Sequence, residues 1–147
     1  MDWVLLIIVV TLTFLTPRLS TYRSINLVLV GEFCVFFGIV ELANLYLEEG
    51  STVYAIKLAH DLVFAFIFWR IGGKMLSKVQ CWIAVFHASL IATLLAGVSI
   101  LDNNYTTIMA GFCTLQILCC LRGALHGIVC SHHVFVAGNS VGRRRTP

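Results

Sequence analysis

Long apolar runs alternate with short polar connectors along the whole chain. The runs cover about residues 2–17, 25–47, 52–71, 81–101 and 105–122. An α-helix needs roughly 20 mostly apolar residues to cross the hydrocarbon of a bilayer. Four of the runs reach or approach that length. The pattern therefore predicts an all-α fold, a polytopic transmembrane helix bundle of about five spans.

The first run is the shortest of the five. Residues 4–16 are apolar, and Pro17 and Arg18 end the run. A span of ~17 residues is near the lower limit for crossing a bilayer. An uncleaved anchor or a re-entrant helix are the alternatives to a full span. We therefore expect five spans, or four if the first run is re-entrant.

Composition agrees with a membrane location. The chain of 147 residues is 59% hydrophobic and only 12% charged, whereas a soluble domain carries about 25% charged residues. We expect one transmembrane domain over residues 1–130 and a cytoplasmic basic tail over residues 131–147. The six cysteines lie in or beside apolar runs, so we interpret them as free thiols that pack as small hydrophobic side chains. No basic stripe with interleaved aromatic residues is present, so no nucleic-acid partner is expected.

The charges of the connectors predict an orientation. Basic residues occur in alternate connectors: Arg18 and Arg23, then Arg70, Lys74 and Lys78, and finally residues 143–145. The N-terminus, residues 48–51 and residues 102–104 contain no Lys or Arg. Because Lys and Arg are enriched in cytoplasmic loops, we expect the N-terminus outside and the C-terminus in the cytoplasm.

The third run carries charged residues inside its first half. Lys57, His60 and Asp61 fall on one helical stripe at 100° per residue. Ionisable groups within a span are costly and normally face a bundle interior or a wet cavity. We expect Glu41 of the second run to pair with Lys57, with Asn44 and His60 nearby. Asp61 then lies deeper and is left without an obvious partner.

A second polar layer is expected nearer the cytoplasmic side, where Glu32 and His87 lie at a similar depth. The intramembrane groups that would serve permeation are thus Asp61, His60, Lys57, Glu41, Asn44, Glu32 and His87. The alternative is an internally neutralised cluster that only fixes helix register.

Small residues predict a packing surface on the fourth run. A ridge of one residue per turn is formed by Ala84, Ala88, Ala92 and Ala96 with Gly97 beside it. Such ridges let two membrane helices approach closely, either within a chain or between copies. Gly123 and Gly127 form a shorter GxxxG pattern just after the fifth run, where its helix would continue.

No cofactor, metal or enzymatic activity is expected. Axial haem ligation needs two histidines at one depth, and the spans place His60, His87 and His126 at different depths. His126, Cys130, His132 and His133 form a weak zinc candidate, but their spacing matches no established finger. The sequence contains no nucleophile elbow or phosphate-binding loop.

Two functions fit this layout. The first is an oligomeric channel or pore-type permeation component whose intramembrane polar cluster is Glu41, Lys57, His60 and Asp61. The outside N-terminus, odd span number and basic tail make the layout similar to that of some phage holins, although the number of charges departs from the usual holin pattern. The second is a non-catalytic accessory or assembly subunit of a larger membrane complex. The expected partners are the lipid bilayer and either further copies of the chain or another membrane subunit.

Overall fold

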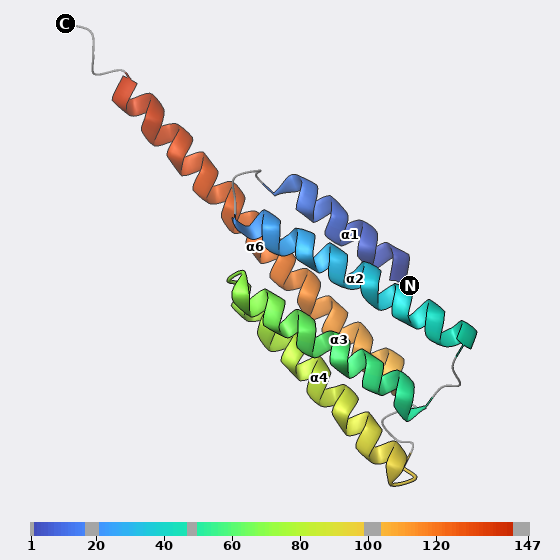
Figure 1. The fold of residues 1–147 in the computed structure, drawn as a ribbon. Coiled ribbons are helices and arrows are strands. Elements are labelled where there is room, and N and C mark those ends of the chain that lie inside the picture. Colours follow the sequence, from blue (N-terminus) through green and yellow to red (C-terminus); the bar gives the residue numbers. More distant parts are fainter. Residues whose placement is uncertain (1, 17–20, 47–49, 99–103, 143–147) are drawn as a thin grey trace, which may run out of the picture.

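A computed structural model describes residues 2–16, 21–46, 50–98 and 104–142, and regular structure in these segments is helical throughout (Figure 1). The helices are α1 (Asp2–Leu15), α2 (Thr21–Tyr46), α3 (Ser51–Arg70), α4 (Lys74–Leu95) and α6 (Tyr105–Gly142). The predicted all-α bundle is confirmed.

Within the described segments, four helices are long and apolar enough to cross a membrane. The candidate spans are Tyr22–Ala43, Ser51–Arg70, Lys74–Leu95 and Tyr105–His126. Helix α1 has 14 residues, so at ~1.5 Å per residue it rises roughly 21 Å, less than the ~30 Å of a hydrocarbon core. It lies beside α2 and also contacts α6 (Figure 1).

Consecutive helices run antiparallel, so alternate connections meet at the same end of the bundle (Figure 1). The end that contains the α3–α4 turn and the start of α2 carries Arg23, Arg70, Lys74, Lys78 and Arg122. We call it the basic end. The sequence contains no Asp or Glu between Asp61 and Asp102 or after Asp102, so the connections at this end bring no carboxylates with them.

The turn between α3 and α4 is shorter than the sequence predicted. The expected span began at residue 81 after a basic loop, but α4 begins at Lys74 and only three residues separate the helices. Gly72 has φ of 84°, a conformation that favours glycine, and the Gly73 amide donates to the Phe68 carbonyl at 2.8 Å. The early start adds about two turns to α4, so every later residue of α4 lies deeper in the bundle than predicted.

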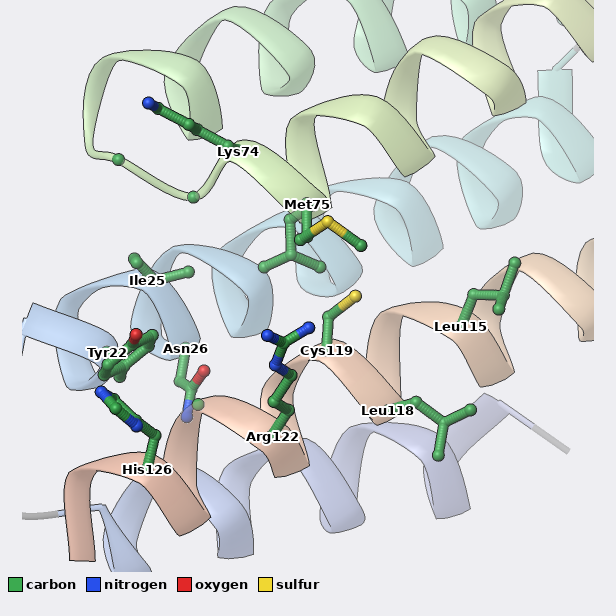
Figure 2. Close-up of a pocket in the computed structure, with 14 residues that line it drawn as sticks. Tyr22, Ile25, Asn26, Lys74, Met75, Leu115, Leu118, Cys119, Arg122 and His126 are labelled. Atoms are coloured by element: carbon green, nitrogen blue, oxygen red, sulfur yellow. The ribbon is translucent and has the colours of Figure 1, made fainter. Parts of the chain in front are cut away.

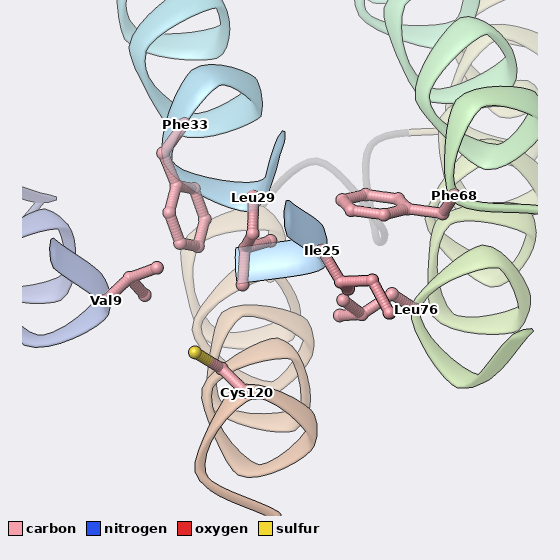
Figure 3. Close-up of a cluster of buried hydrophobic side chains, with 7 residues drawn as sticks. All are labelled: Val9, Ile25, Leu29, Phe33, Phe68, Leu76 and Cys120. Atoms are coloured by element: carbon pink, nitrogen blue, oxygen red, sulfur yellow. The ribbon is translucent and has the colours of Figure 1, made fainter. Parts of the chain in front are cut away.

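One apolar layer joins all the helices (Figure 3). It contains the buried side chains Val9, Ile25, Leu29, Phe33, Phe68, Leu76 and Cys120. Phe68 and Leu29 are fully buried, and Val9 anchors the short α1 to the other helices. The described cysteines, namely Cys34, Cys81, Cys113, Cys119 and Cys120, are free thiols as expected.

The small-residue ridge of α4 faces mainly outward. Ala84 is buried, whereas Ala88, Ala92, Ala96 and Gly97 are exposed. Close packing within the chain instead occurs at Gly123 of α6, where an added Cβ would lie 2.8 Å from Cδ1 of Tyr22.

This close approach predicts an asymmetry between two glycines of α6. Gly123→Ala should destabilise the protein by about 1–3 kcal/mol, because the added methyl group meets the base of the Tyr22 ring. Gly111 has no atom within 4 Å of an added Cβ, so Gly111→Ala should be neutral or slightly stabilising. Unfolding in mixed SDS micelles, followed by circular dichroism, measures both. Equal stabilities of the two variants would show that α2 and α6 do not meet at Gly123.

Helix α6 continues through the predicted domain boundary. Its backbone is helical to Gly142, so the predicted tail of residues 131–147 is largely a helical extension beyond the bundle (Figure 1). The side chains of residues 127–147 and of Asn44 lie outside the described part.

Candidate functional site

Asp61 lies at the centre of a buried polar network. Its side chain is on α3, where the residue is 1% exposed. Oδ2 lies 2.6 Å from Nδ1 of His87 on α4, and Oδ1 lies 3.2 Å from Nδ1 of the neighbouring His60. The prediction that Asp61 lacks a partner is wrong. The early start of α4 is the reason, because it moves His87 to the level of Asp61.

The network continues from His87 to α6. Nε2 of His87 lies 3.3 Å from the hydroxyl of Tyr105. If Nδ1 of a neutral His87 donates to Asp61, Nε2 is left as an acceptor for the tyrosine O–H. Asp61, His87 and Tyr105 then form a continuous donor–acceptor chain across three helices.

His60 is placed between two acceptors. Its Nδ1 faces the Asp61 carboxylate, and its Nε2 lies 3.4 Å from the backbone carbonyl of Glu32 on α2. A neutral imidazole has one N–H and can donate to only one of them, whereas an imidazolium donates to both. Gain or loss of one proton on His60 therefore changes which of its two hydrogen bonds exist.

The Glu32 carboxylate is held by two amides. Gln80 of α4 donates from Nε2 to Oε1 at 2.6 Å, and Gln116 of α6 lies 3.4 Å from Oε2. All three residues are buried: Glu32 is 4% exposed, Gln80 is 0% exposed and Gln116 is 1% exposed. Oε1 of Gln80 is buried without a hydrogen-bond partner among the described residues. The predicted polar layer of Glu32 and His87 is wrong, because Glu32 contacts Gln80 and Gln116 whereas His87 contacts Asp61.

Sequence reasoning missed Gln80, Gln116 and Tyr105. All three are uncharged, so a search for ionisable groups within apolar runs passes over them. A search for amides at the depth of a buried carboxylate would have found the two glutamines once the start of α4 was known.

Lys57 lies among aromatic rings rather than beside Glu41. Its Nζ is 4.6 Å from the ring centroid of Tyr105 and 5.1 Å from that of Tyr54, and such contacts stabilise a desolvated ammonium group. Glu41 is exposed, and no ion pair joins it to Lys57. The predicted pair is wrong because α2 presents Glu32 and Phe36 to α3, and the Phe36 ring lies 5.7 Å from the His60 ring.

The network occupies a definite depth in the bundle. Tyr105 begins α6 at the end opposite the basic end, and Glu32 lies about three turns along α2 from the basic end. Leu29 and Leu76 of the apolar layer lie one turn before Glu32 and Gln80, respectively. Leu29 and Leu76 therefore lie between Glu32 and the basic end.

The proposed metal ligands are only partly described. His126 packs its ring edge-to-face on Tyr22 at a centroid distance of 5.4 Å, while the side chains of Cys130, His132 and His133 lie outside the described residues. Elsewhere in the described chain, no group of three His, Cys, Asp or Glu side chains could hold a metal ion. The different depths expected for His60 and His87 are not found, since both contact Asp61.

Four apolar helices of spanning length around this buried network make the chain a small membrane protein. Its sequence matches no protein-family model and has no significant match among curated proteins or solved structures.

Proposed function

We propose that this membrane protein is a permeation component that works as a homo-oligomer and moves protons through its buried network. The observation that carries the proposal is the hydrogen-bonded series of side chains Tyr105, His87, Asp61 and His60. The series ends at the backbone carbonyl of Glu32, so a transient water would have to carry a proton on to the Glu32 carboxylate. Intramembrane Asp, Glu and His side chains are the usual parts of proton relays. His60 lies between the Asp61 carboxylate and the Glu32 backbone carbonyl, so its ring can hold a proton toward either acceptor.

Protons suit this network better than larger ions. The side chains of the series are packed against aromatic rings, for example His60 on Phe64 at 4.8 Å and His87 on Tyr105 at 5.9 Å between centroids. A hydrated ion needs an open lumen, whereas a proton needs only hydrogen bonds and transient water. The unsatisfied Oε1 of Gln80 offers such a water an acceptor beside Glu32.

The apolar layer is the barrier in this scheme. Protons that reach Glu32 must still pass Leu29, Leu76 and Phe68 to reach the basic end. Wetting of this layer, or its opening between copies of the chain, would complete the path. The outward ridge of Ala88, Ala92 and Ala96 supports close self-association of α4.

The proposed orientation has the N-terminus outside and the C-terminus in the cytoplasm. Apart from Lys57, every Lys and Arg is in or beside the α1–α2 and α3–α4 connections, is Arg122 at the basic end of the bundle, or is among residues 143–145. Cytoplasmic enrichment of these residues then makes the basic end the cytoplasmic one.

The competing function is a non-conducting accessory or assembly subunit. Its polar network would fix the register of α2, α3, α4 and α6, and the ridge on α4 would receive another membrane protein. Glu32 with its two amides fits this role as well, because it links three helices by neutral donors. Purification distinguishes the two: a homogeneous multimer supports permeation, and a chain that is stable only with another protein supports the accessory role.

Proton flux into liposomes tests the proposal. Purified protein is reconstituted around a trapped pH-sensitive dye, and a potassium diffusion potential drives protons inward. We expect acidification faster than in protein-free liposomes, and unchanged flux in Glu41→Gln, which alters an exposed carboxylate outside the network. Reconstituted, folded protein that passes no protons at any pH from about 5 to 8, where histidine titrates, would exclude the relay.

A further inference from the structure

A cavity of about 430 Å³ opens at the basic end, outside the polar network (Figure 2). Its walls come from the start of α2, the α3–α4 turn with the start of α4, and α6. Its volume is within the usual range for small-molecule sites, roughly 300–1,000 Å³. Nothing in the proton relay uses this space.

The cavity combines positive charge with an apolar mouth. Arg122 extends from α6 toward α4, and Lys74 lies at the rim on the first residue of α4 (Figure 2). Met75, Leu115 and Leu118 also line it and are 53%, 48% and 54% exposed on the surface of the bundle. On a membrane-spanning bundle, these three side chains face lipid chains.

Among the described side chains, no carboxylate pairs with either cation. Neither Lys74 nor Arg122 forms an ion pair with a described side chain. The three described carboxylates are accounted for, because Glu32 and Asp61 are buried in the network and Glu41 lies near the far end of α2. The N-cap Gly73 supplies no side chain to cap α4, so the partial positive charge of that helix end adds to the same region.

We infer that this cavity binds the headgroup of an acidic phospholipid from the leaflet at the basic end. The phosphate would bind Arg122, and the long Lys74 side chain, which points away from Arg122 in Figure 2, would turn toward the phosphate from the rim. The acyl chains would descend over Leu115, Leu118 and Met75. Basic pockets between membrane helices bind acidic headgroups in this manner. The apolar mouth favours a lipid over free phosphate, since a free anion gains nothing from it.

Thermal stability in a neutral detergent measures the binding. Dioctanoyl phosphatidylglycerol is titrated into the purified full chain, with dioctanoyl phosphatidylcholine and inorganic phosphate as parallel arms. A ligand that binds the folded state raises the melting temperature in a concentration-dependent way. We expect a saturable rise with phosphatidylglycerol, and a much smaller one with either of the other additions.

Two matched double variants locate the site. Lys74→Gln with Arg122→Gln removes the cavity charges, and should weaken the apparent affinity roughly 30-fold, or about fivefold per charge. The control, Lys78→Gln with Arg23→Gln, removes one Lys and one Arg at the same end, but neither residue lines the cavity. The apparent affinity of this control variant for phosphatidylglycerol should therefore stay within about twofold of the native value.

Three results would overturn the inference. Equal stabilisation by phosphatidylcholine would show that acidity is irrelevant, and equal stabilisation by phosphate would assign the site to a free anion. Equal weakening by both double variants would show general surface attraction rather than a site. Circular dichroism of each variant before titration confirms that the helices are intact.

Discussion

Replacing Asp61 with alanine is expected to lower the free energy of unfolding by about 3–5 kcal/mol. The residue is 1% exposed, and its carboxylate oxygens lie 3.2 Å from Nδ1 of His60 and 2.6 Å from Nδ1 of His87. Its removal leaves two buried imidazoles without their acceptor and breaks the link between α3 and α4. SDS titration of the micellar protein, followed by circular dichroism, measures the loss.

The size of this loss reports the charge state of the network. A neutral hydrogen bond between membrane helices contributes on average ~0.6 kcal/mol and at most about 1.7 kcal/mol. Breaking a buried ion pair costs more because an uncompensated charge remains. Glu41→Ala, at an exposed carboxylate, should change stability by no more than about 0.5 kcal/mol. An Asp61→Ala loss no larger than the Glu41→Ala loss would contradict the described contacts.

Phe68→Ala should destabilise the protein by about 2–3 kcal/mol. The ring is fully buried in the apolar layer that joins the helices. In a membrane the unfolded reference state is also apolar, so little transfer free energy is lost. The cavity left behind still costs about 24 cal/mol per Å³, which for a ring of roughly 100 Å³ gives this value.

The same helix supplies the control for this prediction. Phe66 lies two residues away and is 60% exposed, so Phe66→Ala removes the same ring from the lipid-facing side of α3. The Phe66→Ala variant should lose less than about 1 kcal/mol of stability, because lipid can fill the space left by an exposed ring, whereas a buried cavity stays empty. Similar losses for the two variants would mean that the apolar layer is not packed as in Figure 3.

The helical bundle and the burial of the charged stripe were predictable from the sequence. Apolar runs of spanning length indicate membrane helices by length alone. Lys57, His60 and Asp61 are all buried on α3, as the cost of exposing charge to lipid requires. That argument depends only on periodicity and on the energetics of single groups.

The partners of these groups were not predictable in the same way. Partner assignment depends on helix register, and an error of two turns at the start of α4 placed His87 beside Glu32 instead of Asp61. The error arose because Lys74 and Lys78 were assigned to a loop, although lysines at a helix end can reach the membrane surface by their long side chains. Hydropathy locates the apolar part of a helix and says less about where the helix begins.

The face of α2 that meets α3 was misassigned for a different reason. Glu32 and Glu41 lie on roughly opposite sides of that helix, and charge complementarity favoured Glu41 for Lys57. The structure instead places Lys57 over the Tyr54 and Tyr105 rings. Cation–π partners carry no net charge, so pairing residues by charge overlooks them.

Proton flux through Asp61→Asn, His87→Gln and the double variant tests the central claim most directly. Groups that act as one unit have non-additive effects, so each single variant should lose about as much flux as the double variant. All three should approach the background of protein-free liposomes, while circular dichroism shows intact helices. Native flux through a folded Asp61→Asn protein would contradict the claim that the buried Asp61–His87 pair carries protons.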